Sequence, residues 1–322
     1  MELLTRFPER DVLTDVLGSI NLRSVFYCRS ELRAPWGIRV AGKELASFHV
    51  ITNGKCLLEV ERANRSLMLR SGDLVILPHG HAHVLRDHPK TPPTALEDLL
   101  AKHTLDDQRT LRHGGRGALT TMLCGGFRFE DREISPLLLA LPPVMHIQGA
   151  RGRSVPWLGL TLKYIVSEVG SQHAGSATVL TRLSDILFIQ TARSYFSSAA
   201  DSESGWLRGL RDAQIGRALA LIHSRPAEPW TVASLAAQVA MSRSAFSAKF
   251  AALVGEAPLQ YVTRRRLQKA AQLLRTTPMK LSTIARQAGY DSDMAFNKAF
   301  KRFVGVTPGA YRRAGSRDSA RE

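Results

Sequence analysis

Side chains suited to contacting the edges of nucleic-acid bases occur at related places in two separate stretches of the chain. They are Arg243, Ser244 and Ser247 in the first stretch, and Asp293, Met294, Asn297 and Lys298 in the second. A side-chain amide such as that of Asn297 pairs with adenine and an ammonium such as that of Lys298 with guanine, whereas serine hydroxyls discriminate less. This chemistry requires each stretch to be a helix that turns these residues outward.

The two stretches are copies of one pattern. Residues 242–258 and 292–308 share Ser, Ala, Phe, Phe, Val, Gly and Pro at an offset of 50 residues, and Tyr261 and Tyr311 extend the match. A repeat at this period indicates one supersecondary unit used twice. Each copy has a serine that can cap a helix, apolar residues on one helical face, a glycine suited to the helix end and a proline suited to the next first turn. The serines are Ser242 and Ser292, the glycines Gly255 and Gly305, and the prolines Pro258 and Pro308. The apolar residues are Phe246, Phe250 and Leu253 in the first copy and Phe296, Phe300 and Phe303 in the second.

This pattern predicts two helix-turn-helix units, over about residues 231–252 and 281–303. The alternative is a generic helical hairpin with a solvated polar face. Charge favours the first interpretation, because residues 226–317 hold 15 Lys and Arg but only 4 Asp and Glu, a net charge of +11 out of +16 for the chain. A solvated face would mix signs, whereas one-sided basic charge is typical of phosphate binding. The candidate phosphate contacts are Arg264, Arg265, Arg266, Lys301, Arg302, Arg312 and Arg313.

Residues 206–315 resemble the DNA-binding domain of the AraC/XylS family of bacterial transcription regulators. The second copy carries most of the family signature, from Ile284 through Gly289-Tyr290, Phe296, Phe300 and Gly305 to Pro308, Tyr311 and Arg312. The resemblance implies two helix-turn-helix units on double-stranded DNA, joined by a long helix. Residues 259–274 fit that helix and would span about 24 Å, which could place the two recognition helices roughly 34 Å apart, one turn of DNA.

The sequence pattern of the N-terminal half predicts a β-barrel. Candidate strands, separated by turns such as Asn53-Gly54, cover residues 24–30, 37–40, 47–52, 56–60, 66–69 and 74–77, with returning strands at 119–124 and 126–129. Within this run, Gly72-x5-Pro78-x-Gly80-x2-His83 resembles the second motif of cupins, which are small jelly-roll barrels. The first cupin motif is not met, since only His49 is present, and Asp87 replaces the usual final Asn. The resemblance implies a cupin-like sensor domain over residues 1–150.

His49, His83 and Cys124 are the candidates for an effector pocket or a metal site in that barrel. Imidazole and thiolate groups suit zinc and other transition metals. The alternative is that they are structural histidines and a buried free thiol. No cofactor is expected, the metal is left open, and the expected ligand is an unknown small-molecule effector in the barrel interior.

Two helices, over residues 155–171 and 178–197, are predicted in a connector that spans residues 151–205. In sensor domains of the resembled family such helices form a homodimer contact, and ordinary packing against the barrel is the alternative. Residues 197–205 have the composition of a linker. A helix at 95–102, a loop at 104–117 and a disordered tail at 316–322 complete the predicted chain.

The predicted fold class is therefore α+β: a cupin-like β-barrel, a helical connector and an all-α domain with two helix-turn-helix units. The function expected is a sequence-specific DNA-binding regulator, with RNA polymerase as a candidate partner. The competing hypothesis is a cupin enzyme, such as an oxygenase or isomerase, that is tethered to DNA. Paired carboxylates, a nucleophile–base pair and a phosphate loop are not seen, so no enzyme is expected. The sequence shows neither a signal peptide nor about 18 consecutive apolar residues, and its three cysteines do not suggest disulfides. These features indicate a reduced, cytoplasmic protein with no membrane partner.

Overall fold

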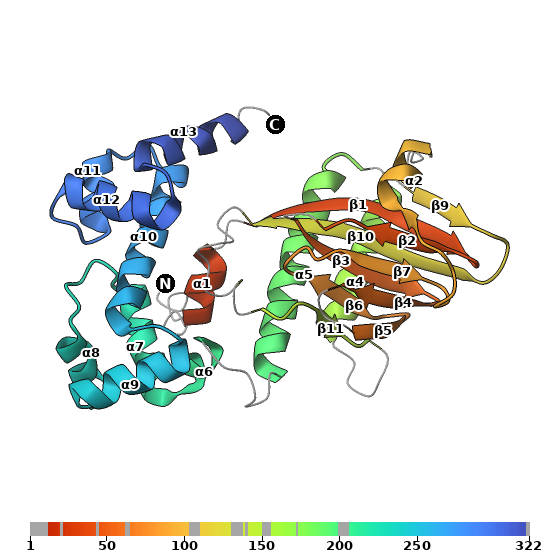
Figure 1. Cartoon of the computed structure of the whole chain (residues 1–322). Coiled ribbons are helices and arrows are strands. Elements are labelled where there is room, and N and C mark those ends of the chain that lie inside the picture. Colours follow the sequence, from red (N-terminus) through yellow and green to blue (C-terminus); the bar gives the residue numbers. More distant parts are fainter. Residues whose placement is uncertain are drawn as a thin grey trace, which may run out of the picture. The chain divides into compact units, whose positions relative to one another are not determined.

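A computed structural model describes residues 12–19, 22–42, 45–61, 65–102, 110–129, 138, 141–149, 156–171, 173–198 and 206–319. These residues form two compact units (Figure 1). The β unit holds all the described strands together with helices α2, α4 and α5, and the helical unit holds α1 and the helices from Trp206 onward. The connector helices α4 and α5 thus belong to the β unit, and α1 belongs with the C-terminal helices although the sequence suggested an N-terminal domain of residues 1–150.

The described strands form two sheets. One has the order β11-β6-β3-β10-β1-β9 and the other the order β5-β4-β7-β2-β8. The first sheet contains β1 (Leu22–Arg33), β3 (Ala46–Asn53), β6 (Leu74–Leu77), β9 (Thr110–Gly114), β10 (Leu119–Phe129) and β11 (Met145–Ile147). The second contains β2 (Gly37–Val40), β4 (Lys55–Val60), β5 (Arg65–Arg70), β7 (His83–Arg86) and β8 (Thr94–Ala95), after which α2 (Leu96–Lys102) follows. Neighbouring strands are antiparallel except for the β1–β9 and β2–β8 pairs.

The core of the β unit lies between the two sheets. Ile51, Val75 and Met122 from the first sheet pack with residues such as Leu58 and Leu85 from the second. The opposite face of the first sheet is also covered: Phe188 of α5 (Ser176–Ser198) lies 5.3 Å, centroid to centroid, from Phe127 of β10. A sheet covered on both faces needs apolar residues on both, which is why all four residues of β6 are buried.

The structure confirms six candidate strands from residue 24 to residue 77 within three residues at each end, and it corrects two expectations. Residues 119–129 form one continuous strand, β10, rather than two. Residues 110–114, expected in a loop, form β9, which pairs in parallel with the end of β1. Gly114, at φ +107°, permits this pairing, because a Cβ there would lie 2.0 Å from the Arg33 carbonyl oxygen. Four of the five residues of β9 are polar or glycine, so the sequence does not read as a strand. Its stability comes instead from pairing with β1.

The helices of the connector run over Pro156–Ser171 (α4) and Ser176–Ser198 (α5) and confirm the expected positions. They pack on each other and α5 packs on β1, so packing against the barrel accounts for one face of the pair. Large apolar side chains nevertheless remain exposed: Leu160, Tyr164 and Val166 on α4, and Val179 and Ile186 on α5. Of the expected linker, residues 199–205 lie outside the described part of the chain.

The helical unit begins with α1 (Val12–Ser19), which packs on α7, and resumes at Trp206. Its helices are α6 (Trp206–Arg211), α7 (Ala213–Ser224), α8 (Val232–Gln238), α9 (Arg243–Val254), α10 (Pro258–Thr276), α11 (Leu281–Gln287), α12 (Asp293–Val304) and α13 (Pro308–Ser319). Two helix-turn-helix units, α8–α9 and α11–α12, are joined by α10 as expected (Figure 1). Of the tail expected at 316–322, residues 316–319 belong to α13 and residues 320–322 lie outside the described part of the chain.

The two units repeat the same caps. Ser242 and Ser292 accept hydrogen bonds from the amides of Ala245 and Ala295. The helices end at Gly255 and Gly305, with φ of 88° and 85°, the left-handed conformation that favours glycine.

The two units also repeat the same aromatic packing. Phe246–Phe250 and Phe296–Phe300 have ring centroids 5.5 and 5.6 Å apart, and Tyr261 and Tyr311 meet the second ring of each pair edge-on. In the first unit the third buried residue is Val254, one turn after Phe250, whereas Leu253 is half-buried.

We expect Phe300→Ala to unfold the second helix-turn-helix unit. Phe300 is fully buried between Phe296 and Tyr311, and truncating a core phenylalanine costs about 3–5 kcal/mol. That is a large share of the stability of a small domain. Calorimetry of the full chain should show an early or missing transition for the helical unit with the β unit unchanged, and DNA binding should be lost. The exposed Lys301→Ala should melt like the wild type, and a Phe300→Ala protein that does the same would contradict this core assignment.

Acid should destabilise the helical unit through His223, which is buried and hydrogen-bonded to the Tyr261 hydroxyl at 2.7 Å. Burial, followed by the charges of Arg265 and Arg264, holds the pKa of His223 well below its usual value of 6.5. The unfolded chain therefore binds the additional proton, and the free energy of unfolding should fall as pH drops below about 6.5, by up to about 1.4 kcal/mol per pH unit. Calorimetry between about pH 7.5 and 5.5 measures this fall, which should be smaller in His223→Gln. Equal pH dependence in both proteins would rule His223 out as its source.

Candidate nucleic-acid interface and effector site

The helices α9 and α12 bring the predicted base-reading residues together on two equivalent surfaces. Arg243 and Ser244 on α9 are exposed, as are Asp293, Met294 and Lys298 on α12. Ser247 and Asn297, one turn further along, are half-buried. Met294 is 81% exposed, which is unusual for a large apolar side chain and leaves it free to contact a partner. The buried aromatic faces thus turn the polar residues outward, as the sequence predicted.

The side-chain amide of Asn297 forms a hydrogen bond within α12. Its Nδ2 donates to the carbonyl oxygen of Asp293, one turn earlier in α12, at 2.8 Å. Pairing with adenine uses this amide group, so binding would exchange an intrahelical hydrogen bond for one to the base. The side chain is therefore held close to the helix until a base edge is presented to it.

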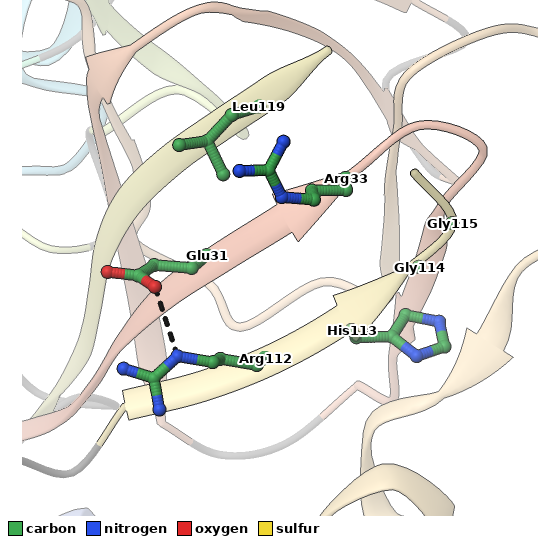
Figure 2. A pocket seen from close by; sticks show the side chains of 7 residues that line it. All are labelled: Glu31, Arg33, Arg112, His113, Gly114, Gly115 and Leu119. Carbon is green, nitrogen blue, oxygen red and sulfur yellow. Dashed lines mark hydrogen bonds and ion pairs between the residues drawn. The ribbon is translucent and has the colours of Figure 1, made fainter. Parts of the chain in front are cut away.

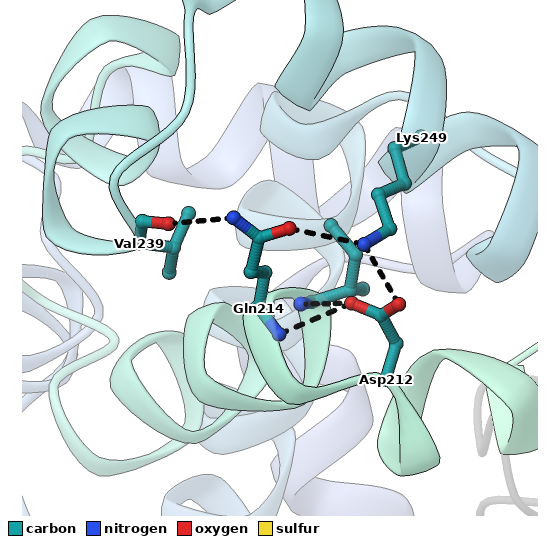
Figure 3. A network of polar contacts seen from close by, with 5 residues as sticks. Asp212, Gln214, Val239 and Lys249 are labelled. Carbon is teal, nitrogen blue, oxygen red and sulfur yellow. Dashed lines mark hydrogen bonds and ion pairs between the residues drawn. The ribbon is translucent and has the colours of Figure 1, made fainter.

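A polar network fixes α9 against the preceding helices (Figure 3). The Lys249 ammonium lies 2.8 Å from Asp212 Oδ2 and donates to Gln214 Oε1 at 3.1 Å, and Gln214 Nε2 donates to the Val239 carbonyl oxygen at 3.1 Å. Asp212 also caps α7 by accepting from the amides of Gln214 and Ile215. Burial opposes ionisation of Asp212, but the Ile215 amide and Lys249 outweigh it and lower the pKa of the carboxyl.

This network was not found from the sequence. Its residues come from three separate helices or their ends, and only Asp212, placed before an apolar helix, carried a recognisable capping signal. Lys249 contributes to the basic charge of this unit, but its place in the sequence does not indicate an inward contact.

Three of the predicted phosphate contacts on α10 are engaged within the protein, which revises the prediction. Arg265 is only 7% exposed, and Arg266 donates to the carbonyl oxygens of Pro226 and Glu228 at 2.8 Å each. Arg264 forms an ion pair with Glu256 and lies over the Tyr261 ring at 4.9 Å. A guanidinium that already holds backbone oxygens or a carboxylate must give these up to bind phosphate. The sequence of three arginines predicted charge but not which way each one points.

Of the four remaining predicted phosphate contacts, one is engaged within the protein and three are exposed. Arg312 donates to the Met279 carbonyl oxygen at 2.6 Å and is half-buried, so it ties α13 to the segment before α11. Lys301, Arg302 and Arg313 are exposed, and none has an ion-pair partner among the described residues. These three are the predicted phosphate contacts that the fold leaves available.

In the β unit, His49, His83 and Cys124 do come together, as a buried chain of hydrogen bonds. His49 Nε2 lies 2.8 Å from His83 Nε2, His49 Nδ1 lies 3.2 Å from Cys124 Sγ, and His83 Nδ1 lies 2.9 Å from the His81 carbonyl oxygen. That oxygen can only accept, so His83 Nδ1 carries a hydrogen and neutral His83 accepts at Nε2. His49 then donates from Nε2 and accepts the thiol hydrogen of Cys124 at Nδ1. The chain is satisfied with every member neutral.

The electrostatics agree with this neutral chain. Burial and the neighbouring His83 hold the pKa of His49 well below its usual value, and burial also lowers the pKa of His83. The neighbouring Cys28, together with burial, raises the pKa of Cys124, so it remains a thiol. Cys28 stands opposite Cys124 across the β1–β10 pair, and the cysteines of the described β unit are thiols rather than disulfides.

These contacts do not resemble a prepared metal site. His83 and Cys124 approach opposite nitrogens of His49, so the three donors do not converge on one point. Within the described part of the chain, no group of three or more His, Cys, Asp or Glu side chains has the arrangement that could hold a metal ion. Asp87, in place of the usual cupin Asn, accepts from the Trp36 amide at 3.1 Å and has a structural use.

A cavity of about 450 Å³ opens elsewhere, at the β9 end of the larger sheet (Figure 2). It is lined by Glu31, Arg33, Arg112, His113, Gly114, Gly115 and Leu119. Arg112 pairs with Glu31 at 3.1 Å, and Glu31 also pairs with Arg29 at 3.1 Å. The sequence did not indicate this cavity, because it depends on β9, which was expected to be a loop.

None of the helices in the described part of the chain combines the length and the apolar character that a bilayer crossing needs.

Comparisons with known proteins match both units. The family model described as Cupin matches residues 11–197, and the model described as Helix-turn-helix domain matches residues 235–314. An AraC-like transcription regulator of Streptomyces lividans is 33% identical over 305 residues, which cover 94% of this chain and 98% of the relative. The HTH-type transcriptional regulator AlkR of Acinetobacter baylyi is 31% identical over 309 residues, covering 94% and 99% of the two chains.

Among solved structures, the DNA-binding domain of AdpA in complex with a target DNA is 34% identical and covers 31% of this chain and 89% of that chain, with a TM-score of 0.30. The full-length relatives and the two family models agree with a cupin fold followed by a helix-turn-helix domain. The chain belongs to the AraC family of DNA-binding transcriptional regulators, with an N-terminal cupin domain and a C-terminal helix-turn-helix domain.

Proposed function

We propose that this regulator reads one bipartite DNA site with α9 and α12 and changes transcription there in response to a small molecule sensed by the cupin domain. The observation that supports the two-part site is the repeat itself. Two helices with equivalent caps and cores turn their polar faces outward from one strongly basic unit. Base contacts come from Arg243, Ser244 and Ser247 on α9 and from Asp293, Met294, Asn297 and Lys298 on α12. Lys301, Arg302 and Arg313 contact phosphate.

The protein acts as a homodimer in this proposal. Leu160 and Tyr164 lie one turn apart on α4 and are 58% and 67% exposed, and Val179 and Ile186 on α5 are 43% and 45% exposed. Exposed apolar side chains gathered on two packed helices are typical of protein interaction surfaces. A dimer also places two DNA-binding units on neighbouring sites, which strengthens binding without new contacts. RNA polymerase is a further partner for a regulator bound beside a promoter, and the protein works in the cytoplasm.

The cupin domain is a sensor rather than an enzyme in this proposal. The buried histidines are neutral and engaged with each other, and Cys124 is a protonated thiol, so none of the three is prepared for nucleophilic or acid–base work. A sensor needs a site whose occupancy favours one of two states of the protein. A buried chain of exchangeable hydrogen bonds meets that need, because a polar ligand can replace one member and shift the others.

Asn297→Ala should lower affinity for the preferred DNA site by about 1–3 kcal/mol and relax the choice of base at one position. Selection of duplexes from a random pool by the purified full chain gives the preferred site, and titration with that duplex and its single-base variants measures the change. Asn297→Asp is the matched variant, since it keeps the shape but replaces the amide donor by a carboxylate and should also disfavour adenine. If either variant keeps the wild-type affinity and base preference, α12 does not present Asn297 to the groove.

His49→Ala and His83→Ala should remove the response to the inducing signal while leaving DNA binding intact. Each change interrupts the hydrogen-bond chain at the point where we place the effector, and neither residue belongs to the helical unit. A reporter gene under the protein's target promoter, read with protein levels, measures the response, and a gel-shift titration measures DNA binding. Normal induction by both variants would exclude the histidines from the signal site. Loss of the folded β unit in calorimetry would instead show that the two histidines are structural.

A further inference from the structure

The two recognition helices differ in charge at equivalent positions. At the repeat offset of 50 residues, three exposed positions of the later turns are alanine in α9 and cationic in α12. The pairs are Ala248 and Lys298, Ala251 and Lys301, and Ala252 and Arg302. All six residues are exposed, so the difference lies on the outward surface and not in the core. Cores and caps are alike in the two units, so this contrast belongs to the outward surfaces, which the proposed function turns toward DNA.

A lysine is present in α9, but it is turned inward. Lys249 follows Ala248 by one residue, a rotation of about 100° around the helix, and its ammonium is held by Asp212 and Gln214 (Figure 3). The equivalent of Lys249 in α12 is Ala299, which packs against the core beside Phe300. The first copy therefore has Ala248-Lys249 where the second has Lys298-Ala299. The lysine of α9 thus faces the neighbouring helices, whereas the lysine of α12 faces outward. Arg243, at the first turn, is the outward cation that α9 retains.

These two surfaces suit different parts of a duplex. Exposed Lys and Arg side chains bind phosphate, and the affinity they contribute falls as salt rises because counterions are released. Alanine carries no charge and has a short side chain, so an alanine surface lets the helix approach the base edges closely. The apolar group that the major groove offers there is the C5-methyl of thymine, which alanine methyls contact. Contacts of this kind depend little on salt.

We propose that α12 anchors the protein electrostatically through Lys301 and Arg302, and that α9 reads thymine methyl groups through Ala248 and its small neighbours Ser244 and Ser247. This inference rests on the proposed two-part DNA site. The preferred site has two unequal halves: a thymine-containing half under α9 whose recognition is insensitive to salt, and a half under α12 that carries most of the salt dependence.

The first experiment measures affinity against salt concentration with the full chain and its selected duplex. Lys301→Ala/Arg302→Ala should lower the log–log slope by about two, since each phosphate contact contributes about 0.9. The reciprocal variant, Ala251→Lys/Ala252→Arg, places the same charges at the equivalent positions of α9. It should raise the slope and the affinity for unrelated duplexes while weakening the preference for the selected first half. All four positions are exposed, so calorimetry should show wild-type folding. An unchanged slope in Lys301→Ala/Arg302→Ala would overturn the anchoring role of α12.

The second experiment removes thymine methyls without changing base pairing. The half under α12 is the one whose preferred base changes in Asn297→Ala, and the other half is then assigned to α9. Replacing thymidine by deoxyuridine in the α9 half should weaken binding about four-fold for each methyl group that the protein contacts. The same replacement in the α12 half should have a smaller effect, confined to a thymine that Met294 contacts. Equal losses in the two halves, or no loss in the α9 half, would overturn the reading role of the α9 surface.

The outcomes separate this inference from the function on which it rests. If the selection yields no preferred sequence, sequence-specific DNA binding itself is contradicted. If it yields a preferred two-part site whose halves respond alike to salt and to deoxyuridine, the function stands and the division between α9 and α12 is wrong.

Discussion

The packed aromatic rings on the inward face of each recognition helix are the constraint on which the DNA-binding unit depends. In both copies two phenylalanines one turn apart pack together and a tyrosine from the following helix meets the second ring edge-on, with centroid distances that agree within 0.2 Å between the copies. Rings of this size leave little freedom to rotate the helix about its axis, because any rotation would open a void. The outward face of each helix is therefore determined by the residues on its inward face, and the outward residues are free to differ between copies.

Basic residues in this unit serve two purposes that composition alone cannot separate. Arg266 and Arg312 tie the helices α10 and α13 to backbone carbonyls of preceding segments, and Lys249 holds α9 to Asp212. Such contacts position the recognition helices, since a buried or half-buried cation is stable only where oxygens satisfy it. The exposed cations, concentrated on α12, remain for the partner. Some of the basic residues of the helical unit thus hold its helices together, and the others form a surface suited to binding phosphate.

In the β unit the governing fact is that one sheet is covered on both faces. The side that faces the second sheet carries His49 and Cys124, which join His83 in a neutral hydrogen-bond chain, and the side that faces α5 carries phenylalanines. Polar groups buried this deeply are tolerable only when each has a partner. The same requirement links the candidate effector residues to the stability of the barrel, because a ligand that enters this chain must replace the hydrogen bonds it interrupts.

Much of this protein could be inferred from the sequence by itself. The repeat at 50 residues, the serine caps and the glycines at the helix ends are local signals, and they determined both helix-turn-helix units and the outward placement of Arg243, Asn297 and Lys298. The alternation of strands and turns, with the motif that ends at His83, indicated the cupin-like half. Tertiary structure alone decided the rest: that residues 110–114 add a strand beside β1, that Arg265 is buried, that Lys249 points inward, and that His83 and Cys124 meet opposite nitrogens of His49. Each of these depends on partners 34 to 81 residues away or on the direction of a long flexible side chain. Local periodicity carries no information about either, because both are set by packing between elements that are distant in sequence.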